Sequence, residues 1–269
     1  MAGLLGDLAD LVLPAPCAGC EAERVPLRYG VCAGCAAGLE ALRPFRRPSG
    51  SLSSGLPPCV AVGAYEGALR GVLLAYKEKG RHRLAQPLGS LLATAVARLA
   101  PRGTPVTLVP VPSTAAAARE RHGDHMLRLA AHTVRRLRAA GWQADVSPQL
   151  EALPRPDSTS LSVAGRRAAA EDSLRIRRAR IGVRRRATPP EGTLVVVDDI
   201  VTTGATLAAV TRRLEEAKMQ VDGAAVLAAT QLRRSSTSGF AGFPPGGTEK
   251  VNAGHPVSRT RGDAGASAR

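Results

Sequence analysis

The stretch that most constrains the fold is residues 193–207, which read TLVVVDDIVTTGATL. Its apolar run, residues 194–197, is largely β-branched and has no polar alternation, the pattern of a strand covered on both faces in a parallel sheet. Two acids, Asp198 and Asp199, follow the run, and a threonine-rich loop then leads into a helical pattern. The stretch therefore predicts an α/β domain in which a buried strand delivers two carboxylates and a hydroxyl-rich loop to a helix N-terminus.

A loop of this kind suits a phosphorylated sugar. The helix dipole favours an anion, and the backbone N–H groups of four consecutive residues can converge on a phosphate: Thr203, Gly204, Ala205 and Thr206. Gly204 lets the backbone come close, and carboxylates just beyond the strand can accept hydrogen bonds from vicinal ribose hydroxyls. The simpler interpretation, a helix N-cap with a solvated acidic neighbour, explains the acid pair but not the whole string.

The string of four apolar residues, two acids, two apolar residues and TTGAT resembles the phosphoribosyl pyrophosphate (PRPP) signature of the type I phosphoribosyltransferases. The resemblance implies that Asp198 and Asp199 hold the ribose hydroxyls. It also implies that the loop of Thr202, Thr203, Gly204, Ala205 and Thr206 wraps the 5-phosphate. The expected fold is a parallel sheet flanked by helices, with the ligand at the carboxyl ends of the strands.

Four of the five cysteines have the spacing of a structural zinc site: Cys17, Cys20, Cys32 and Cys35. Two CxxC knuckles separated by eleven residues can bring four thiolates to one point. A segment of about thirty residues with little else to bury needs such a metal to fold. A redox CxxC or incidental cysteines are the alternatives, but neither predicts two matched pairs. Because no ligand position is left open, we assign the zinc no catalytic role, and Cys59 is expected to be a buried core thiol.

The order of these features resembles the ComF family. A four-cysteine ribbon is followed by YEGALRGVLLAYKEKG, then by LVPVP, then by the Asp-Asp-Thr-Thr-Gly signature, over roughly residues 4–232. Members join a zinc ribbon to a phosphoribosyltransferase-like domain and are associated with competence and DNA uptake. The resemblance implies that Lys77 lies near the phosphate pocket. It also places the loop of Val111, Pro112, Ser113 and Thr114 against the pyrophosphate, with Mg²⁺ bridging pyrophosphate and ribose oxygens.

Two segments depart from the family pattern. Residues 119–125, RERHGDH, lack the aromatic of the usual Arg-Gly-Phe-Asn or Arg-Gly-Phe-Asp stretch, although Arg121, Gly123 and Asp124 still align. This segment is either a basic loop over pyrophosphate or a solvated loop. In residues 151–191 the usual Gln and Asn positions are replaced, and nine arginines lie between Arg166 and Arg186. Those arginines either face a polyanion or form a solvated surface.

Charge leaves two functional hypotheses open. The 37 Lys and Arg residues against 22 Asp and Glu give a net charge of +15, which predicts attraction to polyanions such as nucleic acid. Aromatic residues make up only 3%, so platforms for base stacking are scarce. One hypothesis is a phosphoribosyltransferase with an unknown acceptor, in which Asp198 and Asp199 form the catalytic site and Asp199 assists as a base. The other is a non-catalytic protein that keeps the fold and binds single-stranded DNA or DNA-uptake partners.

The predicted organisation has four parts. Residues 1–42 form an N-terminal helix, over 3–12, and the zinc ribbon; 43–58 form a linker rich in Pro, Gly and Ser; 59–232 form the phosphoribosyltransferase-like domain; and 233–269 form a disordered tail. The N-terminus has no basic leader, and no apolar run approaches 18 residues. The sequence therefore predicts a cytoplasmic protein without a membrane span, and it leaves the oligomeric state open.

Overall fold

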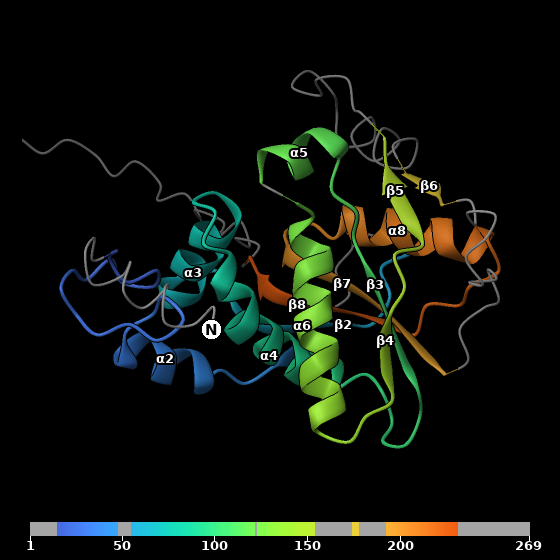
Figure 1. Ribbon diagram of the computed structural model, residues 1–269. Coiled ribbons are helices and arrows are strands. Elements are labelled where there is room, and N and C mark those ends of the chain that lie inside the picture. The colour runs from blue at the N-terminus through green and yellow to red at the C-terminus, as the bar shows by residue number, and fades with distance from the viewer. Residues whose placement is uncertain (1–14, 48–54, 122, 154–173, 178–191, 231–269) are drawn as a thin grey trace, which may run out of the picture. The chain divides into compact units, whose positions relative to one another are not determined.

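The computed structural model describes residues 15–47, 55–121, 123–153, 174–177 and 192–230. Its main sheet has six strands in the order β1-β2-β8-β7-β3-β4 (Figure 1). β1 is antiparallel to β2, and all other neighbours are parallel. The strands are β1 (Phe45–Arg47), β2 (Cys59–Ala64), β3 (Val106–Pro110), β4 (Ala144–Val146), β7 (Thr193–Val201) and β8 (Gly223–Ala229). The mostly parallel sheet that the sequence predicted is confirmed.

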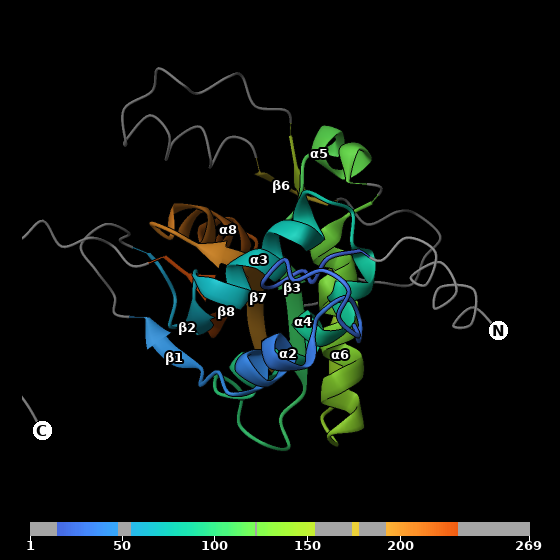
Figure 2. The same ribbon diagram turned by 90° about the vertical axis from the view of Figure 1, so that its left-hand side faces the viewer.

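Both faces of the sheet are apolar, and helices cover each of them (Figure 2). The residues of β7 alternate between two cores, with Val195 and Val197 in one and Leu194 and Val196 in the other. The first core contains α3, α4 and α6, and the second contains α8. The helices are α2 (Ala33–Glu40), α3 (Gly67–Lys77), the 3₁₀ helix η1 (His82–Leu84), α4 (Ala85–Val96), α5 (Ala115–Glu120), α6 (His125–Ala139) and α8 (Ala205–Glu216).

Residues 15–42, which we call the cysteine unit, pack directly on α3. A Cβ at Gly71 would lie only 2.6 Å from the carbonyl oxygen of Gly19 and 2.7 Å from that of Ala18, so only glycine permits this approach. Arg81 reinforces the contact, because its guanidinium donates to the carbonyl oxygens of Pro16 at 2.7 Å and Gly30 at 3.3 Å. The cysteine unit thus shares the core of α3 and α4 instead of standing apart.

Three details differ from the sequence-based expectation. Part of the predicted linker, Phe45–Arg47, forms β1, because pairing with β2 satisfies its backbone. The apolar run of residues 221–228 predicts the strand that closes the sheet, but β8 lies inside the sheet, between β2 and β7. A second sheet, of β5 (Leu150–Ala152) and β6 (Leu174–Ile176), was not predicted, and its Leu150 and Leu174 enter the same core as α8.

Several predicted features lie outside the described residues. They are the helix of residues 3–12, most of the arginine-rich segment and the tail of residues 233–269. None of the described helices combines the length and the apolar character that crossing a membrane requires.

Candidate functional site

The two acids of the signature lie inside β7, not beyond its end as expected. β3 pairs with β7 only as far as Pro110 and Val197, whereas β8 continues to pair through Val201. The acids therefore occupy the stretch of β7 that has lost one neighbouring strand, where β3 turns away. Asp199 is buried, with 5% of its surface exposed, and Asp198 is partly buried. The carboxyl edge of the sheet thus opens beside the two acids.

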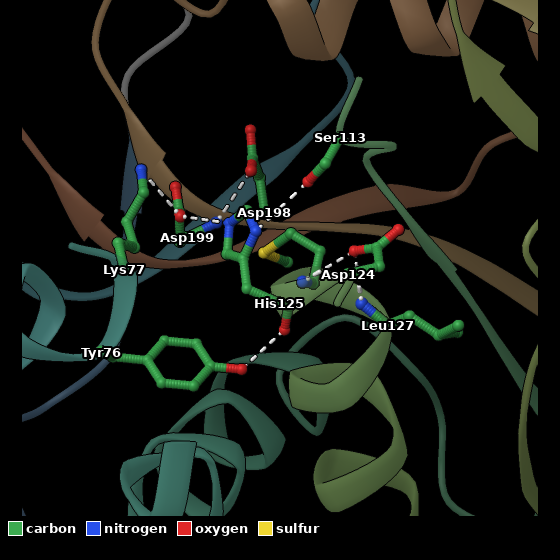
Figure 3. A network of polar contacts seen from close by, with 9 residues as sticks. Tyr76, Lys77, Ser113, Asp124, His125, Leu127, Asp198 and Asp199 are labelled. Carbon is green, nitrogen blue, oxygen red and sulfur yellow. Dashed lines mark hydrogen bonds and ion pairs between the residues drawn. The ribbon is translucent and has the colours of Figure 1, made fainter. Parts of the chain in front are cut away.

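Asp199 is held by two positively polarised groups (Figure 3). Its Oδ2 lies 2.9 Å from Nζ of Lys77 and 3.0 Å from Nε2 of His125. Burial alone would raise the pKa of Asp199, but the hydrogen bond from His125 and the charge of Lys77 outweigh that effect and lower it. Asp199 is therefore an ionised group that fixes Lys77, the residue that family resemblance placed near the phosphate pocket.

Asp198 is in the opposite state. Burial and the adjacent charge of Asp199 raise its pKa to about 8, and the lowering effects of the Asp199 N–H and of Lys77 are smaller. The Asp199 N–H donates to Oδ1 of Asp198 at 2.9 Å. At neutral pH Asp198 therefore carries a proton for most of the time, and a small change in its surroundings can release it.

His125 is the functional candidate that sequence reasoning missed. Asp124 caps α6 by accepting from the N–H groups of Met126 and Leu127, which places His125 in the first turn. The hydroxyl of Tyr76 donates to the backbone oxygen of His125 at 2.7 Å, and the Tyr76 ring meets the imidazole edge-on. In the sequence, residues 119–125 are a candidate loop over pyrophosphate, and the N-cap predicts the helix start, but neither indicates the direction of the imidazole.

The segment at 119–125 therefore is not one basic loop. Arg119 and Glu120 end α5, and Asp124 begins α6. Gly123 adopts φ = 123°, a conformation that favours glycine, and connects the two helices.

The loop after β3 contributes one side chain to the network. Val111 is 8% exposed, and its N–H donates to the oxygen of Val197, so its side chain belongs to the core. Thr114 caps α5. Ser113 Oγ, by contrast, lies 3.2 Å from Nδ1 of His125. The structure thus links Ser113 to Asp199 through the imidazole.

The predicted phosphate loop lies at the start of α8. Gly204 adopts the left-handed conformation, φ = 84°, and serves as the N-cap residue. The Ala205 N–H donates to Oγ1 of Thr203 at 3.3 Å. The N–H groups that follow in the first turn of α8 point along the helix axis and have no acceptor within the helix. The guanidinium of Arg47, from β1, donates to the oxygen of Thr202 and so brings a cation to this loop.

The four predicted metal ligands come together as expected. The sulfur atoms of Cys17, Cys20, Cys32 and Cys35 lie within 4.8 Å of one another and are positioned to bind a metal such as zinc. Although burial acts against it, N–H groups donated by the backbone, first that of Cys32, lower the pKa of Cys17 to about 6. Burial and the neighbouring sulfurs raise the pKa of Cys35. A tetrathiolate site would need an external cation to ionise all four.

A model of the phosphoribosyl transferase domain matches residues 138–238. The matched region contains β7 with both acids, the loop into α8, and β8. Lys77, Ser113 and His125 precede it. No curated protein gives a significant match to the chain. The chain therefore joins a phosphoribosyl transferase domain to an N-terminal four-cysteine cluster.

Proposed function

We propose that the protein is a ComF-type phosphoribosyltransferase-like protein that binds PRPP, or another ribose 5-phosphate ligand, together with Mg²⁺. The observation that carries the proposal is the continuity of β7. Its two acids lie where the sheet edge opens, and the strand ends at Val201, directly before the short loop from Thr202 to the Gly204 helix start. A sugar with hydroxyls at one end and a phosphate at the other fits that order of donors and acceptors.

Each part of the ligand has a proposed partner. Asp198 and Asp199 accept from the ribose hydroxyls, the loop of Thr202–Thr206 binds the 5-phosphate, and Ser113 belongs to the loop assigned to pyrophosphate. Lys77, which contacts Asp199, is assigned to the phosphate pocket. Mg²⁺ would be held by oxygens of the ligand, and the oxygen-rich surroundings of the two acids and Ser113 suit this hard cation. When bound, the ion neutralises charge on the departing pyrophosphate.

The chain's own contribution to transfer is positioning and proton handling. As pyrophosphate leaves C1, charge develops on the ribose, and the fixed carboxylate of Asp199 lies on the side assigned to the sugar hydroxyls. Asp199 is a poor base because its pKa is lowered. Asp198, whose pKa is raised to about 8, is protonated at neutral pH before the ligand binds, and it can take a proton from an incoming nucleophile only after ligand binding has released its own.

Calorimetry tests the ligand assignment. PRPP with Mg²⁺ should give binding heat with the wild type and none with the Asp198→Asn/Asp199→Asn double variant. Glu215→Gln is the matched control, because this exposed acid lies on α8 away from the loop and should leave the affinity unchanged. Unfolding curves establish that each variant is folded. No heat from the wild type would refute the proposal.

We assign the four-cysteine cluster a structural zinc ion. The sulfur spacing suits a tetrahedral site in which every position is taken by the protein, and such sites stabilise folds without taking part in catalysis. Metal analysis should give about one zinc per chain.

A second candidate function is binding of single-stranded DNA, as the association of the ComF family with DNA uptake suggests. The observation that favours it is the net charge of +15. If arginines meet phosphates, affinity must fall steeply as salt increases. Failure to bind a single-stranded oligonucleotide even at low salt would remove this candidate and leave the PRPP assignment untouched.

A further inference from the structure

His125 joins the two sides of the proposed site through one ring. Its Nε2 lies 3.0 Å from Oδ2 of Asp199 on β7, and its Nδ1 lies 3.2 Å from Oγ of Ser113 in the loop after β3 (Figure 3). The side chain is 8% exposed, and Tyr76 contacts both the ring and the backbone oxygen of the residue. The imidazole therefore cannot turn away without losing contacts on several sides.

The hydrogen atoms in this chain of contacts can be assigned from the chemistry of the partners. An ionised carboxylate only accepts, so Nε2 of His125 must carry a hydrogen toward Asp199. In the neutral ring Nδ1 is then bare and can only accept. Ser113 must therefore donate its single hydroxyl hydrogen to Nδ1, and in that state it has no hydrogen left for an anion.

One added proton reverses the Ser113 contact. In the imidazolium ring Nδ1 also carries a hydrogen, which it donates to Oγ of Ser113. The hydroxyl hydrogen is then released and can point to a phosphate oxygen. The protonated ring also adds a second positive charge to that of Lys77, because both groups contact Oδ2 of Asp199.

We propose that His125 is a positioning residue that makes Ser113 a hydrogen-bond donor to the pyrophosphate group, and that PRPP binding is therefore coupled to uptake of one proton by the imidazole. The inference rests on the proposed function and adds the protonation state in which the ligand is held. The other charged or titratable groups of this network are Asp198 on β7, which accepts from the Asp199 N–H, Lys77 and Tyr76 on α3, and Asp124 and Arg128 on α6, which both act on Tyr76.

Two variants distinguish the effect of protonating His125 from the effect of its hydrogen bonds. Glutamine at position 125 can donate through its amide nitrogen and accept through its oxygen, as the neutral ring does, but it cannot take up a proton. Ser113→Ala removes the donor that the proton releases. If Ser113 acts through His125, the His125→Gln/Ser113→Ala double variant should lose no more of the proton-linked affinity than either single variant.

The measurement is calorimetry of the full chain with Mg²⁺ at about pH 6 and about pH 8, in two buffers of different ionisation heat, which yields both affinity and protons taken up. PRPP is the test ligand, and ribose 5-phosphate is the control that lacks pyrophosphate. Affinities are compared with those of His125→Gln, so that titration of the ligand itself cancels.

We expect wild type and His125→Gln to bind PRPP equally at the higher pH. At the lower pH the wild type should bind about tenfold more tightly than His125→Gln or Ser113→Ala, the effect of one hydrogen bond to a charged group. Ribose 5-phosphate should not distinguish wild type from His125→Gln at either pH. This pattern would support the coupling.

Two results would overturn the inference while the proposed function stands. One is the same pH dependence of PRPP affinity in wild type and His125→Gln. The other is an equal loss of affinity for both ligands at both pH values, which would mark His125 as a purely structural residue. Failure of the wild type to bind either ligand would instead overturn the proposed function and the inference together.

Discussion

The cysteine unit and the carboxyl end of β7 each gather acidic groups in a small volume, but different partners neutralise them. Lys77 and His125 both contact Asp199, so that charge is met inside the chain. In the cysteine unit, the described contacts of the sulfurs come from backbone N–H groups and from other sulfurs. The charge of Asp199 is thus balanced within the chain, whereas four ionised thiols would need a cation from outside the chain.

The same two regions differ in what holds them together. β7 contributes alternate residues to two cores, and Val195, Val196 and Val197 are completely buried. The cysteine unit buries few apolar side chains besides its cysteines, among them Ala18, Val31 and Leu39. Since stabilisation by burial follows the apolar area removed from water, we expect the sheet to fold on its cores and the cysteine unit to need a metal for its stability.

Removing the metal with a chelator should therefore destabilise the cysteine unit and leave the sheet folded. We expect this to be the largest of the effects. Removing a structural zinc costs about 10 kcal/mol of binding free energy, which the small core of the cysteine unit cannot replace. Hydrogen exchange should become fast in α2 and stay slow in β7. Cys17→Ser should act like the chelator, and Cys59→Ala, at a buried thiol outside the cluster, should retain the metal. Persistent protection of α2 without metal would contradict the comparison.

Gly71→Ala should loosen the contact between the two regions without touching either cluster. Alanine normally favours a helix over glycine, but here the added Cβ meets the carbonyl oxygens of the cysteine unit. We expect a loss of about 3 kcal/mol in the free energy of unfolding, measured by urea denaturation. Gly38→Ala in α2, whose Cβ would meet no atom within 4 Å, should be neutral or stabilising. Equal effects of the two substitutions would refute the close approach.

Asp198→Asn should show how the buried acid pair affects stability as the pH changes. Folding raises the pKa of Asp198 from 3.8 to about 8, so between about pH 4 and 8 the native state keeps a proton that the unfolded chain loses. The free energy of unfolding therefore falls as pH rises through that window. Asparagine cannot ionise, and because each pKa unit corresponds to about 1.4 kcal/mol, the variant should be more stable by several kcal/mol at about pH 8.

Urea denaturation at about pH 5 and about pH 8 measures this effect, with Glu215→Gln as the exposed-acid control. The gain in stability should be accompanied by weaker PRPP binding. An unchanged pH dependence in Asp198→Asn would show that Asp198 ionises normally in the folded chain.

The sequence predicted best what depends on neighbours along the chain. The apolar run of β7, the acids after it, the glycine before α8 and the paired CxxC knuckles are all local patterns with one dominant structural solution. The sequence also predicts a first strand of the larger domain over residues 59–64, and β2 has these bounds. β1 was missed because three residues between proline-rich flanks carry no periodicity, and only pairing with β2 makes them a strand.

Contacts between distant segments could not be predicted from such patterns. Lys77 was placed near the pocket by family resemblance alone, since a lysine at a helix end is usually a solvated residue. His125 meets Ser113 and Asp199, which are 12 and 74 residues away, and it had no role in the sequence-based site. The raised pKa of Asp198 likewise depends on burial and on the adjacent charge, neither of which a motif specifies.

Tyr76→Phe should give the smallest effect and test the support behind the acid pair. The hydroxyl of Tyr76 is buried and donates to the backbone oxygen of His125 at 2.7 Å, so phenylalanine keeps the packing but leaves that oxygen with one partner fewer. We expect a loss of about 1 kcal/mol in the free energy of unfolding. Tyr65→Phe, at a partly buried ring outside the network, is the control and should cost less. If His125 is fixed mainly by Asp199 and Ser113, PRPP affinity should fall only slightly. A loss of PRPP binding as large as that of the Asp198→Asn/Asp199→Asn double variant would mean instead that Tyr76, not the acid pair, determines the position of the imidazole.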